Sequence, residues 1–291
     1  MTQPIFARAF QRTAPALFVL LWSTGFIGAK LGLPFAPPFT FLLLRMIAVA
    51  SILTLLGLAA KARWPSSLKE AGHIAFAGLM VHAVYLGGVF AAISHGMGAG
   101  LVALIVGMQP LLTASVAPRL FGEKVGPRQW LGLGLGLVGV ALVVSRKISL
   151  EGGPEAILWA LGALAGITIG TLYQKRHCGS MDLRTGAAIQ YWATAVLLLI
   201  MAATTETMQV TWNGQFVFAL AWLVLVLSVG AIFLLYLLIR QGQASRVASL
   251  FYLTPPTTAV MAWGLFDESL SSIVLVGFVI VAIGVALARK P

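Results

Sequence analysis

Long apolar stretches without charge constrain this chain more than any other feature of its sequence. The stretches Leu101–Ala117 and Ile273–Ala288 contain no charged side chain. A helix needs about 20 mainly apolar residues to cross the hydrocarbon core of a bilayer, so stretches of this kind indicate membrane-spanning helices. Of all residues, 59% are hydrophobic and 9% are charged, whereas a soluble domain carries about 25% charged residues. We therefore predict an all-α integral membrane protein.

Ten apolar stretches are predicted to cross the membrane as transmembrane helices. The connections between them are short and leave no room for a separate soluble domain. The alternating polarity that marks the strands of a membrane β-barrel is absent. The ten predicted spans are 14–33, 38–59, 71–94, 97–118, 129–145, 156–175, 185–203, 214–239, 244–264 and 270–288.

The distribution of Lys and Arg predicts the orientation of these spans. The net charge is +11, which in a soluble protein would suggest a nucleic-acid partner. Here most basic residues lie in the short connections, and they gather on the cytoplasmic side if the N-terminus is cytoplasmic. We therefore expect a multi-pass protein of a bacterial inner membrane with both termini in the cytoplasm. Its expected partners are the lipid bilayer and a small-molecule substrate, with no nucleic acid, and we expect it to act as a monomer.

The chain contains an internal repeat. Residues 98–142 align without a gap with residues 243–287, at a constant offset of 145, and 15 of the 45 pairs are identical. The identical pairs include Pro110 with Pro255 and Glu123 with Glu268. Paired Pro and Glu residues at one offset are hard to obtain by chance from apolar sequence. Repeats of this length indicate an architecture built from similar units.

The number of spans in each repeat predicts how the repeats are related. Each holds five predicted spans, an odd number, so the second repeat must enter the membrane from the opposite side. Inverted repeats are typical of secondary transporters, whose substrate site lies near the middle of the membrane where the repeats meet. We predict a first repeat over 14–147 and an inverted second repeat over 156–288, arranged around a central cavity.

Several short motifs carry a family resemblance. They are Trp22-Ser-Thr-Gly-Phe, Pro38-Phe-Thr-Phe-Leu-Leu-Leu-Arg45, Pro110-Leu-Leu-Thr-Ala, Phe121-Gly-Glu-Lys, and the helix with Gly132 and Gly139. With second-half counterparts around Pro255, Glu268 and Gly284, they resemble the EamA-type unit of the drug/metabolite transporter superfamily over nearly the whole chain. In general similarity the chain is closest to bacterial exporters of aromatic amino acids. The resemblance implies a basket of ten helices with a central cavity and with the fifth and tenth spans at the periphery.

Four residues are candidates for substrate binding because of their side chains and their places in the spans. Trp22 and Tyr252 are aromatic and belong to spans that line the cavity in the resembled family. His82 and Tyr85 are three residues apart and would share one face of the third span. A buried imidazole could bond a substrate or carry a proton. Packing against neighbouring helices is the alternative for each of the four.

Prolines mark two further candidate positions. Gln109 precedes Pro110, and Thr254 precedes Pro255 and Pro256, at matching places in the two repeats. A proline inside a helix removes a hydrogen bond and frees a carbonyl, which the membrane tolerates where that group is buried in protein or faces a cavity. We expect kinks or gates at these prolines, beside the substrate path, with Gln109 and Thr254 contacting substrate. Packing kinks without a ligand are the alternative.

Arg45 is the most costly residue to place. An arginine inside a span costs about 2.5–3.5 kcal/mol on insertion scales. It could bind an anionic group such as a carboxylate, or it could be a structural residue bonded to loop carbonyls or helix ends. Because the resembled family has an arginine here whatever the substrate, we favour the structural role.

The remaining features favour transport over catalysis. The sequence has no Gly-x-Ser-x-Gly, no His-Glu-x-x-His and no phosphate-binding loop. No Asp or Glu falls inside a predicted span, and we predict no catalytic residue, no metal site and no cofactor. We predict a secondary transporter that exports small amphipathic metabolites, foremost aromatic amino acids, by alternating access. The alternatives are an exporter of cationic drugs from the same superfamily and a membrane-embedded enzyme.

Overall fold

The computed structural model describes residues 5–97, 102, 105–144, 153–241, 247–266 and 272–289, and within these ranges the regular structure is helical throughout. The elements before residue 145 are α1 (Ile5–Gly32), a 3-10 turn (Leu33–Phe35), α2 (Pro38–Ala59), α3 (Leu68–Gly78), a π-helical segment (Leu79–Val84), α4 (Tyr85–Ser94), α6 (Gln109–Phe121) and α7 (Pro127–Val144).

The elements after residue 152 repeat this order. They are α8 (Gly153–His177), α9 (Leu183–Thr205), α10 (Gly214–Trp222), a π-helical segment (Leu223–Ala231), α11 (Ile232–Gln241), a 3-10 segment (Ser249–Leu253), α13 (Thr254–Phe266) and α14 (Ser272–Arg289). The offset of 145 found in the sequence separates the bounds of α6 from those of α13 and the bounds of α7 from those of α14. It also separates the ends of α1 and α8, so helices of the first half have counterparts at this offset in the second half.

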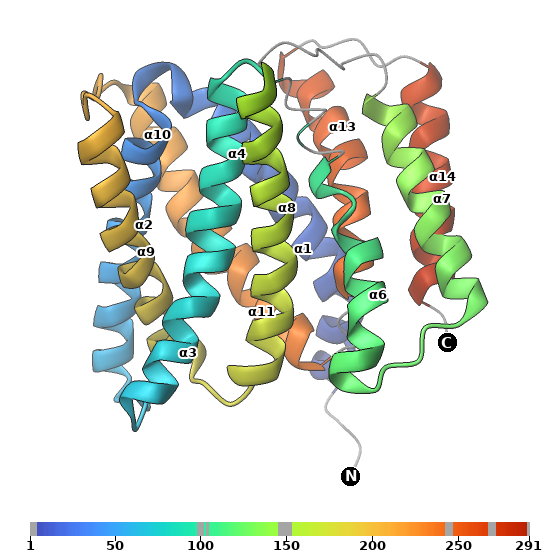
Figure 1. Ribbon diagram of the computed structural model, residues 1–291, viewed down its shortest axis with the longest axis horizontal. Helices are drawn as coiled ribbons and strands as arrows, with labels where there is room; N and C mark the ends of the chain where they lie inside the picture. Colours follow the sequence, from blue (N-terminus) through green and yellow to red (C-terminus); the bar gives the residue numbers. More distant parts are fainter. Residues whose placement is uncertain are drawn as a thin grey trace.

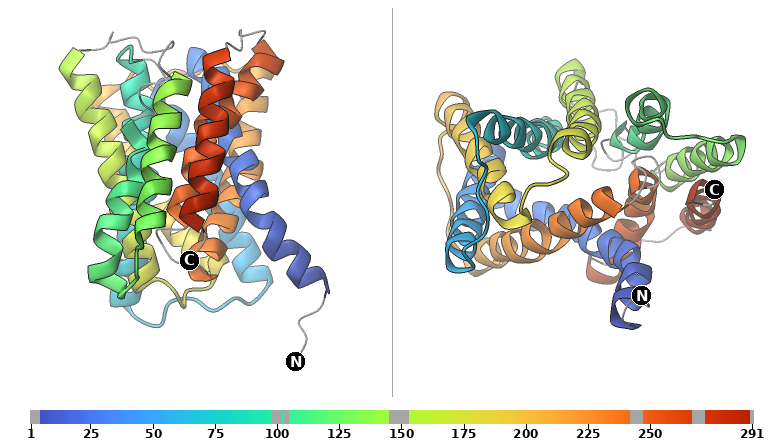
Figure 2. Two further views of the ribbon diagram at one scale, coloured as in Figure 1. Left: turned by 90° about the vertical axis from the view of Figure 1, so that its right-hand side faces the viewer. Right: turned by 90° about the horizontal axis from the view of Figure 1, so that it is seen from below.

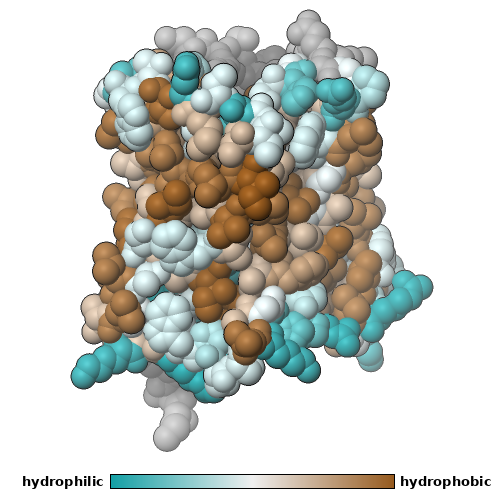
Figure 3. Space-filling view, turned by 60° about the vertical axis from the view of Figure 1, so that its left-hand side comes forward, coloured by the Kyte–Doolittle hydropathy of each residue, from teal (hydrophilic) through white to brown (hydrophobic). Residues whose placement is uncertain are grey.

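Several helices in the described part of the chain have the length and composition of membrane spans. Six are long and apolar enough to cross a bilayer. Their bounds are Thr13–Phe35, Pro38–Ala59, Leu68–Ser94, Gly153–His177, Leu183–Thr205 and Gly214–Arg240. In the space-filling view, hydrophobic residues form a broad band between polar upper and lower ends (Figure 3). This distribution is that of a protein embedded in a lipid bilayer.

Polar groups at helix ends explain where several helices begin. Asn213 starts α10 by accepting a hydrogen bond from the Phe216 backbone N–H at 2.8 Å. Glu206, just after α9, accepts hydrogen bonds from the backbone N–H groups of Phe39 and Thr40 at 2.7 Å each. The first N–H groups of a helix have no partner within the helix, so this carboxylate completes the start of α2 and joins it to the end of α9.

The helices pack in pairs drawn from the two halves of the chain. α2 packs along α9, α7 along α14, and α4 beside α8, while α1 contacts α13 and the second π-helical segment. α7 and α14 stand at one edge of the bundle (Figures 1 and 2). A Cβ atom on Gly132 would lie 2.5 Å from the Gly284 carbonyl oxygen. Small residues therefore let these two helices approach closely.

The structure differs from the sequence prediction at the fourth and ninth spans. Continuous helices kinked at proline were expected over 97–118 and 244–264. Instead α6 begins at Gln109 after a turn, and α13 begins at Thr254 after the 3-10 segment. The prolines lie in the first turns of these helices, where a missing N–H is tolerated and the fixed φ angle favours a helix start. At this level the described part of the fourth span contains a turn, and that of the ninth span passes through a 3-10 segment that continues into α13.

Some predicted boundaries lie outside the described residues. The fourth span was predicted to start at 97, yet residues 98–101 are not described. The same holds for the predicted end of the fifth span at 145 and the end of the first repeat at 147. It also holds for the starts of the ninth and tenth spans at 244 and 270.

Candidate substrate cavity

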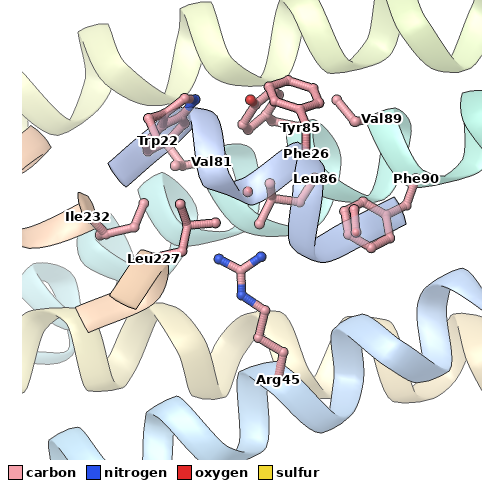
Figure 4. Close-up of a pocket in the computed structure, with 12 residues that line it drawn as sticks. Trp22, Phe26, Arg45, Val81, Tyr85, Leu86, Val89, Phe90, Leu227 and Ile232 are labelled. Atoms are coloured by element: carbon pink, nitrogen blue, oxygen red, sulfur yellow. The ribbon is translucent and has the colours of Figure 1, made fainter. Parts of the chain in front are cut away.

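A narrow cavity lies among helices from both halves of the chain. It is lined from α1, α2 and α4, from α11, and from the two π-helical segments. π-helical turns are uncommon and often occur at functional sites. Figure 4 shows the lining, which consists of Trp22, Gly25, Phe26, Ala29, Arg45, Val81, Tyr85, Leu86, Val89, Phe90, Leu227 and Ile232.

Aromatic rings form one wall of this cavity. The rings of Trp22 and Tyr85 are stacked, with centroids 6.3 Å apart and an angle of 9° between their planes. Phe251, from the 3-10 segment before α13, meets the Trp22 ring edge-on at 5.2 Å. Stacked and edge-on contacts are the favoured geometries of aromatic pairs. Such a wall offers ring faces to an aromatic or apolar ligand.

Arg45 brings a buried positive charge to the same cavity. Its side chain is 2% exposed, and its Nε donates a hydrogen bond to the Ser228 hydroxyl at 2.9 Å. The guanidinium points from α2 toward the aromatic wall and Leu227 (Figure 4). Within the described ranges it has no ion pair with a carboxylate and no contact with a loop carbonyl. The structural role favoured from the sequence, with bonds to loop carbonyls or helix ends, does not match this geometry.

The cavity is small in this conformation. The centre of a water-sized sphere has about 30 Å³ in which to move, and a single buried water needs roughly 10–15 Å³ measured in this way. There is thus room for a few waters but not for an aromatic amino acid. A ligand of that size requires the surrounding helices to move apart.

His82 lies behind the cavity wall rather than in it. His82 belongs to the π-helical segment Leu79–Val84, and Tyr85 is the first residue of α4. Of the two, only Tyr85 lines the cavity. The His82 ring stacks on Tyr191 at 4.3 Å, and its Nε2 lies 3.2 Å from the Tyr236 hydroxyl. That hydroxyl donates to the Gln190 side-chain oxygen, so it accepts from Nε2. Nδ1 is left without a partner among the described residues.

Gln109 and Thr254 occupy equivalent places at the starts of α6 and α13. The Gln109 side-chain nitrogen donates to the Thr171 hydroxyl of α8 at 3.3 Å. The Ser23 hydroxyl of α1 donates to the Val19 carbonyl oxygen at 2.7 Å and lies 3.4 Å from the Thr254 carbonyl oxygen. Neither residue lines the cavity, but the α13 start adjoins it through Ser23, the neighbour of Trp22. Tyr252 does not line the cavity either, and its ring packs against α7, where it would lie 2.5 Å from a Cβ atom on Gly136.

Buried polar atoms without partners gather on the predicted site residues. Fully bonded polar groups are the rule in protein interiors, and each exception needs an explanation. Within the part of the chain that the structure describes, the unpaired buried side-chain atoms are His82 Nδ1, Gln109 Oε1, Thr113 Oγ1, the Tyr252 hydroxyl and Thr254 Oγ1. Four of these five residues were selected from the sequence for substrate binding.

The structure therefore brings together only part of the predicted site. Trp22 and Tyr85 meet in the cavity, whereas His82, Gln109, Tyr252 and Thr254 do not line it. Arg45, for which the sequence favoured a structural role, is also among the residues that line the cavity. The sequence places no Asp or Glu inside a predicted span to neutralise this arginine. The described residues contain no group of three or more His, Cys, Asp or Glu side chains that could hold a metal ion.

Comparisons with known proteins agree with this architecture. The chain matches the EamA-like transporter family over residues 14–145 and 154–289. The uncharacterized inner membrane transporter YedA of Escherichia coli (strain K12) is 28% identical, over 98% of this chain and 90% of its own length. The uncharacterized transporter YvbV of Bacillus subtilis is 26% identical, over 94% of this chain and 90% of its own.

Two further similarities extend the comparison. The probable amino-acid metabolite efflux pump of Escherichia coli is 25% identical, over 92% of this chain and 91% of its own length. A solved crystal structure superposes with a TM-score of 0.78 at 19% identity, covers 94% of this chain and 95% of that protein, and shares the fold. Both halves of the chain match one family, its relatives are membrane transporters, and the protein belongs to the EamA-like transporter family.

Proposed function

We infer that this protein is a secondary transporter of a bacterial inner membrane that exports small amphipathic metabolites, with aromatic amino acids as the leading candidates. The observation that carries this proposal is the cavity between the two halves, where stacked Trp22 and Tyr85 face the buried guanidinium of Arg45. Aromatic faces suit the ring of such a substrate, and a few polar groups suit its charged end. The name of the Escherichia coli efflux pump supports the same class of substrate.

The proposed architecture is ten spans in two inverted repeats, over 14–147 and 156–288. The common offset of 145 between elements supports the repeat. Helix direction supports the inversion, since α1 rises from the end of the molecule that bears the N-terminus, whereas its counterpart α8 runs toward that end (Figure 1). With five spans in each repeat, the N- and C-termini lie on one side, which the positive-inside rule assigns to the cytoplasm.

Alternating access follows from the size and place of the cavity. A substrate too large for the narrow form must enter a conformation open to one side and leave from one open to the other. The turn before α6 and the 3-10 segment before α13 stand at equivalent positions in the two repeats. They give the bundle places where the following helices can tilt. We propose that these starts, with Gln109, Pro110, Thr254, Pro255 and Pro256, flank the path.

Export of strongly cationic drugs is disfavoured by the same cavity. Its only charged lining residue is Arg45, which repels a cation in a medium of low dielectric constant. Catalysis within the membrane would need clustered catalytic groups at that depth, and the cavity lining supplies none. Transport of a molecule that is neutral overall or anionic is the function that this chemistry supports.

Flux in proteoliposomes tests the proposal. The purified full-length protein should give saturable, protein-dependent movement of labelled tryptophan or phenylalanine. Trp22→Ala should lower this flux because it removes half of the stacked pair, whereas Trp263→Ala, at a side chain that is 53% exposed on α13, should leave it unchanged. Absence of saturable flux for every aromatic amino acid would refute the substrate assignment.

A further inference from the structure

We propose that Arg45 is the carboxylate-binding subsite of the cavity and that the transported molecules are aromatic or apolar carboxylates, including acids that lack an amino group. This inference rests on the proposed function for the route that the molecule takes. The inference also narrows the proposed class of substrates, because the cavity would recognise the carboxylate of the substrate rather than its amino group.

The first support is the charge of Arg45 without a counter-ion. An ionised side chain deep in a protein is strongly unfavourable unless it is paired. In the described ranges, acids such as Glu70, Glu155 and Glu206 stand at helix ends, and none of them lines the cavity. A ligand that carries its own negative charge supplies the missing partner.

The second support is the geometry of the guanidinium. Arginine has five N–H donors arranged as a planar fork that matches the two oxygens of a carboxylate. Only Nε is used within the described structure, in the bond to Ser228 of the second π-helical segment. This bond fixes the side chain from behind, and the two terminal nitrogens point toward the cavity (Figure 4). A structural arginine would instead direct these nitrogens to backbone carbonyls.

The third support is the asymmetry of the remaining lining. Apart from Arg45, the cavity is built from apolar and aromatic side chains, and its other side-chain polar groups are the Tyr85 hydroxyl and the Trp22 indole N–H. No carboxylate lines it that could pair with the ammonium group of an amino acid. The carboxylate of a bound molecule therefore has a charged partner and its ammonium group has none, so loss of the amino group should be tolerated and loss of the carboxylate should not.

Ligand binding to the purified full-length protein in detergent tests this directly. The probes are 3-phenylpropanoate, its neutral amide 3-phenylpropanamide, L-phenylalanine, 2-phenylethylamine and acetate, and each affinity is obtained from the concentration dependence of the thermal unfolding temperature. The wild-type protein should bind 3-phenylpropanoate about 10-fold or more tightly than the amide, as expected for a hydrogen-bonded charge pair. 2-Phenylethylamine should bind weakly, and acetate should too because it lacks the ring.

Variants assign the preference to Arg45. Arg45→Gln should weaken 3-phenylpropanoate binding about 10-fold or more while leaving the amide unchanged. Arg45→Lys, which keeps the charge but loses the fork, should retain an intermediate preference. Ser228→Ala frees the Arg45 side chain and should cause a smaller loss confined to carboxylates. Arg184→Gln is the matched control, since Arg184 pairs with Asp182 outside the cavity.

The outcomes separate the inference from the proposed function. Equal affinity of the wild-type protein for acid and amide, or no binding of any probe, overturns the inference even if Arg45→Gln fails to fold. A carboxylate preference that survives in Arg45→Gln overturns it as well. Saturable flux of aromatic amino acids without a carboxylate preference would support the proposed transport function and refute the Arg45 subsite. A carboxylate preference without any flux would support the subsite and refute the transport function.

Discussion

Individual side chains form a polar chain that leads from the middle of the bundle toward the end that carries the N-terminus. His82 contacts Tyr236, whose hydroxyl donates to Gln190, and the Gln190 side-chain nitrogen donates to the Gln174 oxygen at 2.7 Å. All four side chains are buried. Each such hydrogen bond adds little to the free energy of unfolding when both partners are present. Removing one partner lowers that free energy more strongly, because the other buried polar group is left unpaired.

Tyr236→Phe should therefore destabilise the protein. Removal of the hydroxyl leaves His82 Nε2 and the Gln190 oxygen unpaired, at a cost of about 1–3 kcal/mol for a buried polar group. The measurement is thermal unfolding in detergent. Tyr252→Phe is the control, because the buried Tyr252 hydroxyl has no partner among the described residues, and its loss should be neutral or stabilising. Equal destabilisation by both changes would contradict this hydrogen-bond arrangement.

Cys178 should react slowly with thiol reagents. It follows the end of α8, is 2% exposed, and its burial raises the pKa of the thiol to about 11. The thiolate is the reactive form, and at neutral pH a thiol with this pKa has about a hundredfold less of it than one with the ordinary value of 9.0.

Maleimide labelling of the folded protein at pH 7 provides the measurement. Labelling should be slow until the protein is unfolded, when it should become rapid. A Lys69→Cys variant in a Cys178→Ala background, with its thiol at an exposed position near the start of α3, should label rapidly in the folded state. Fast labelling of Cys178 in the folded wild-type protein would show that this region is more open than described.

Close contacts between helices determine which glycines cannot be replaced by a larger residue without loss of stability. A Cβ atom on Gly88 of α4 would lie 2.6 Å from the Trp159 carbonyl oxygen of α8. Backbone atoms cannot yield as a flexible side chain can, so α4 and α8 must separate to admit a methyl group. Gly162, also on α8, has nothing within 4 Å of the same position.

Gly88→Ala should lower the free energy of unfolding by about 1–3 kcal/mol, the usual cost of overpacking. Gly162→Ala should leave it unchanged or raise it slightly, because alanine favours a helix over glycine by about 1 kcal/mol. Thermal unfolding of the two variants side by side checks both. Similar stabilities for the two would contradict the close approach of α4 and α8.

The positions of many helices along the chain, and the repeat that relates them, were accessible from the sequence because they depend on local pattern. The second predicted span, 38–59, has the bounds of α2, and the offset of 145 relates elements well beyond the residues first aligned. The π-helical segments and the helix starts at Gln109 and Thr254 were not predicted, since they depend on packing between distant helices. The direction of the Arg45 side chain could not be predicted either, because it is set by a hydrogen bond to Ser228, which is 183 residues away in the sequence.

The whole molecule combines two similar halves around one narrow cavity. Residues of the first half supply Trp22, Arg45 and Tyr85, and the second half closes the cavity with its π-helical segment and α11. A relative movement of the halves would change the width of this cavity, because it is lined from both. The peripheral helices α7 and α14 contribute no residue to the cavity lining. A movement of the two halves therefore would not need these helices to contact the substrate.

Counterflow in proteoliposomes tests the central claim, transport by alternating access through this cavity. Vesicles that contain the full-length protein are loaded with unlabelled tryptophan and diluted into a trace of labelled tryptophan. Alternating access predicts a transient accumulation of label above equilibrium, because each outward passage of unlabelled substrate returns the protein to bind label outside. The overshoot should be lost in Trp22→Ala and kept in Trp263→Ala. Label entry that never exceeds equilibrium, and that is unaffected by the internal tryptophan, would contradict alternating access.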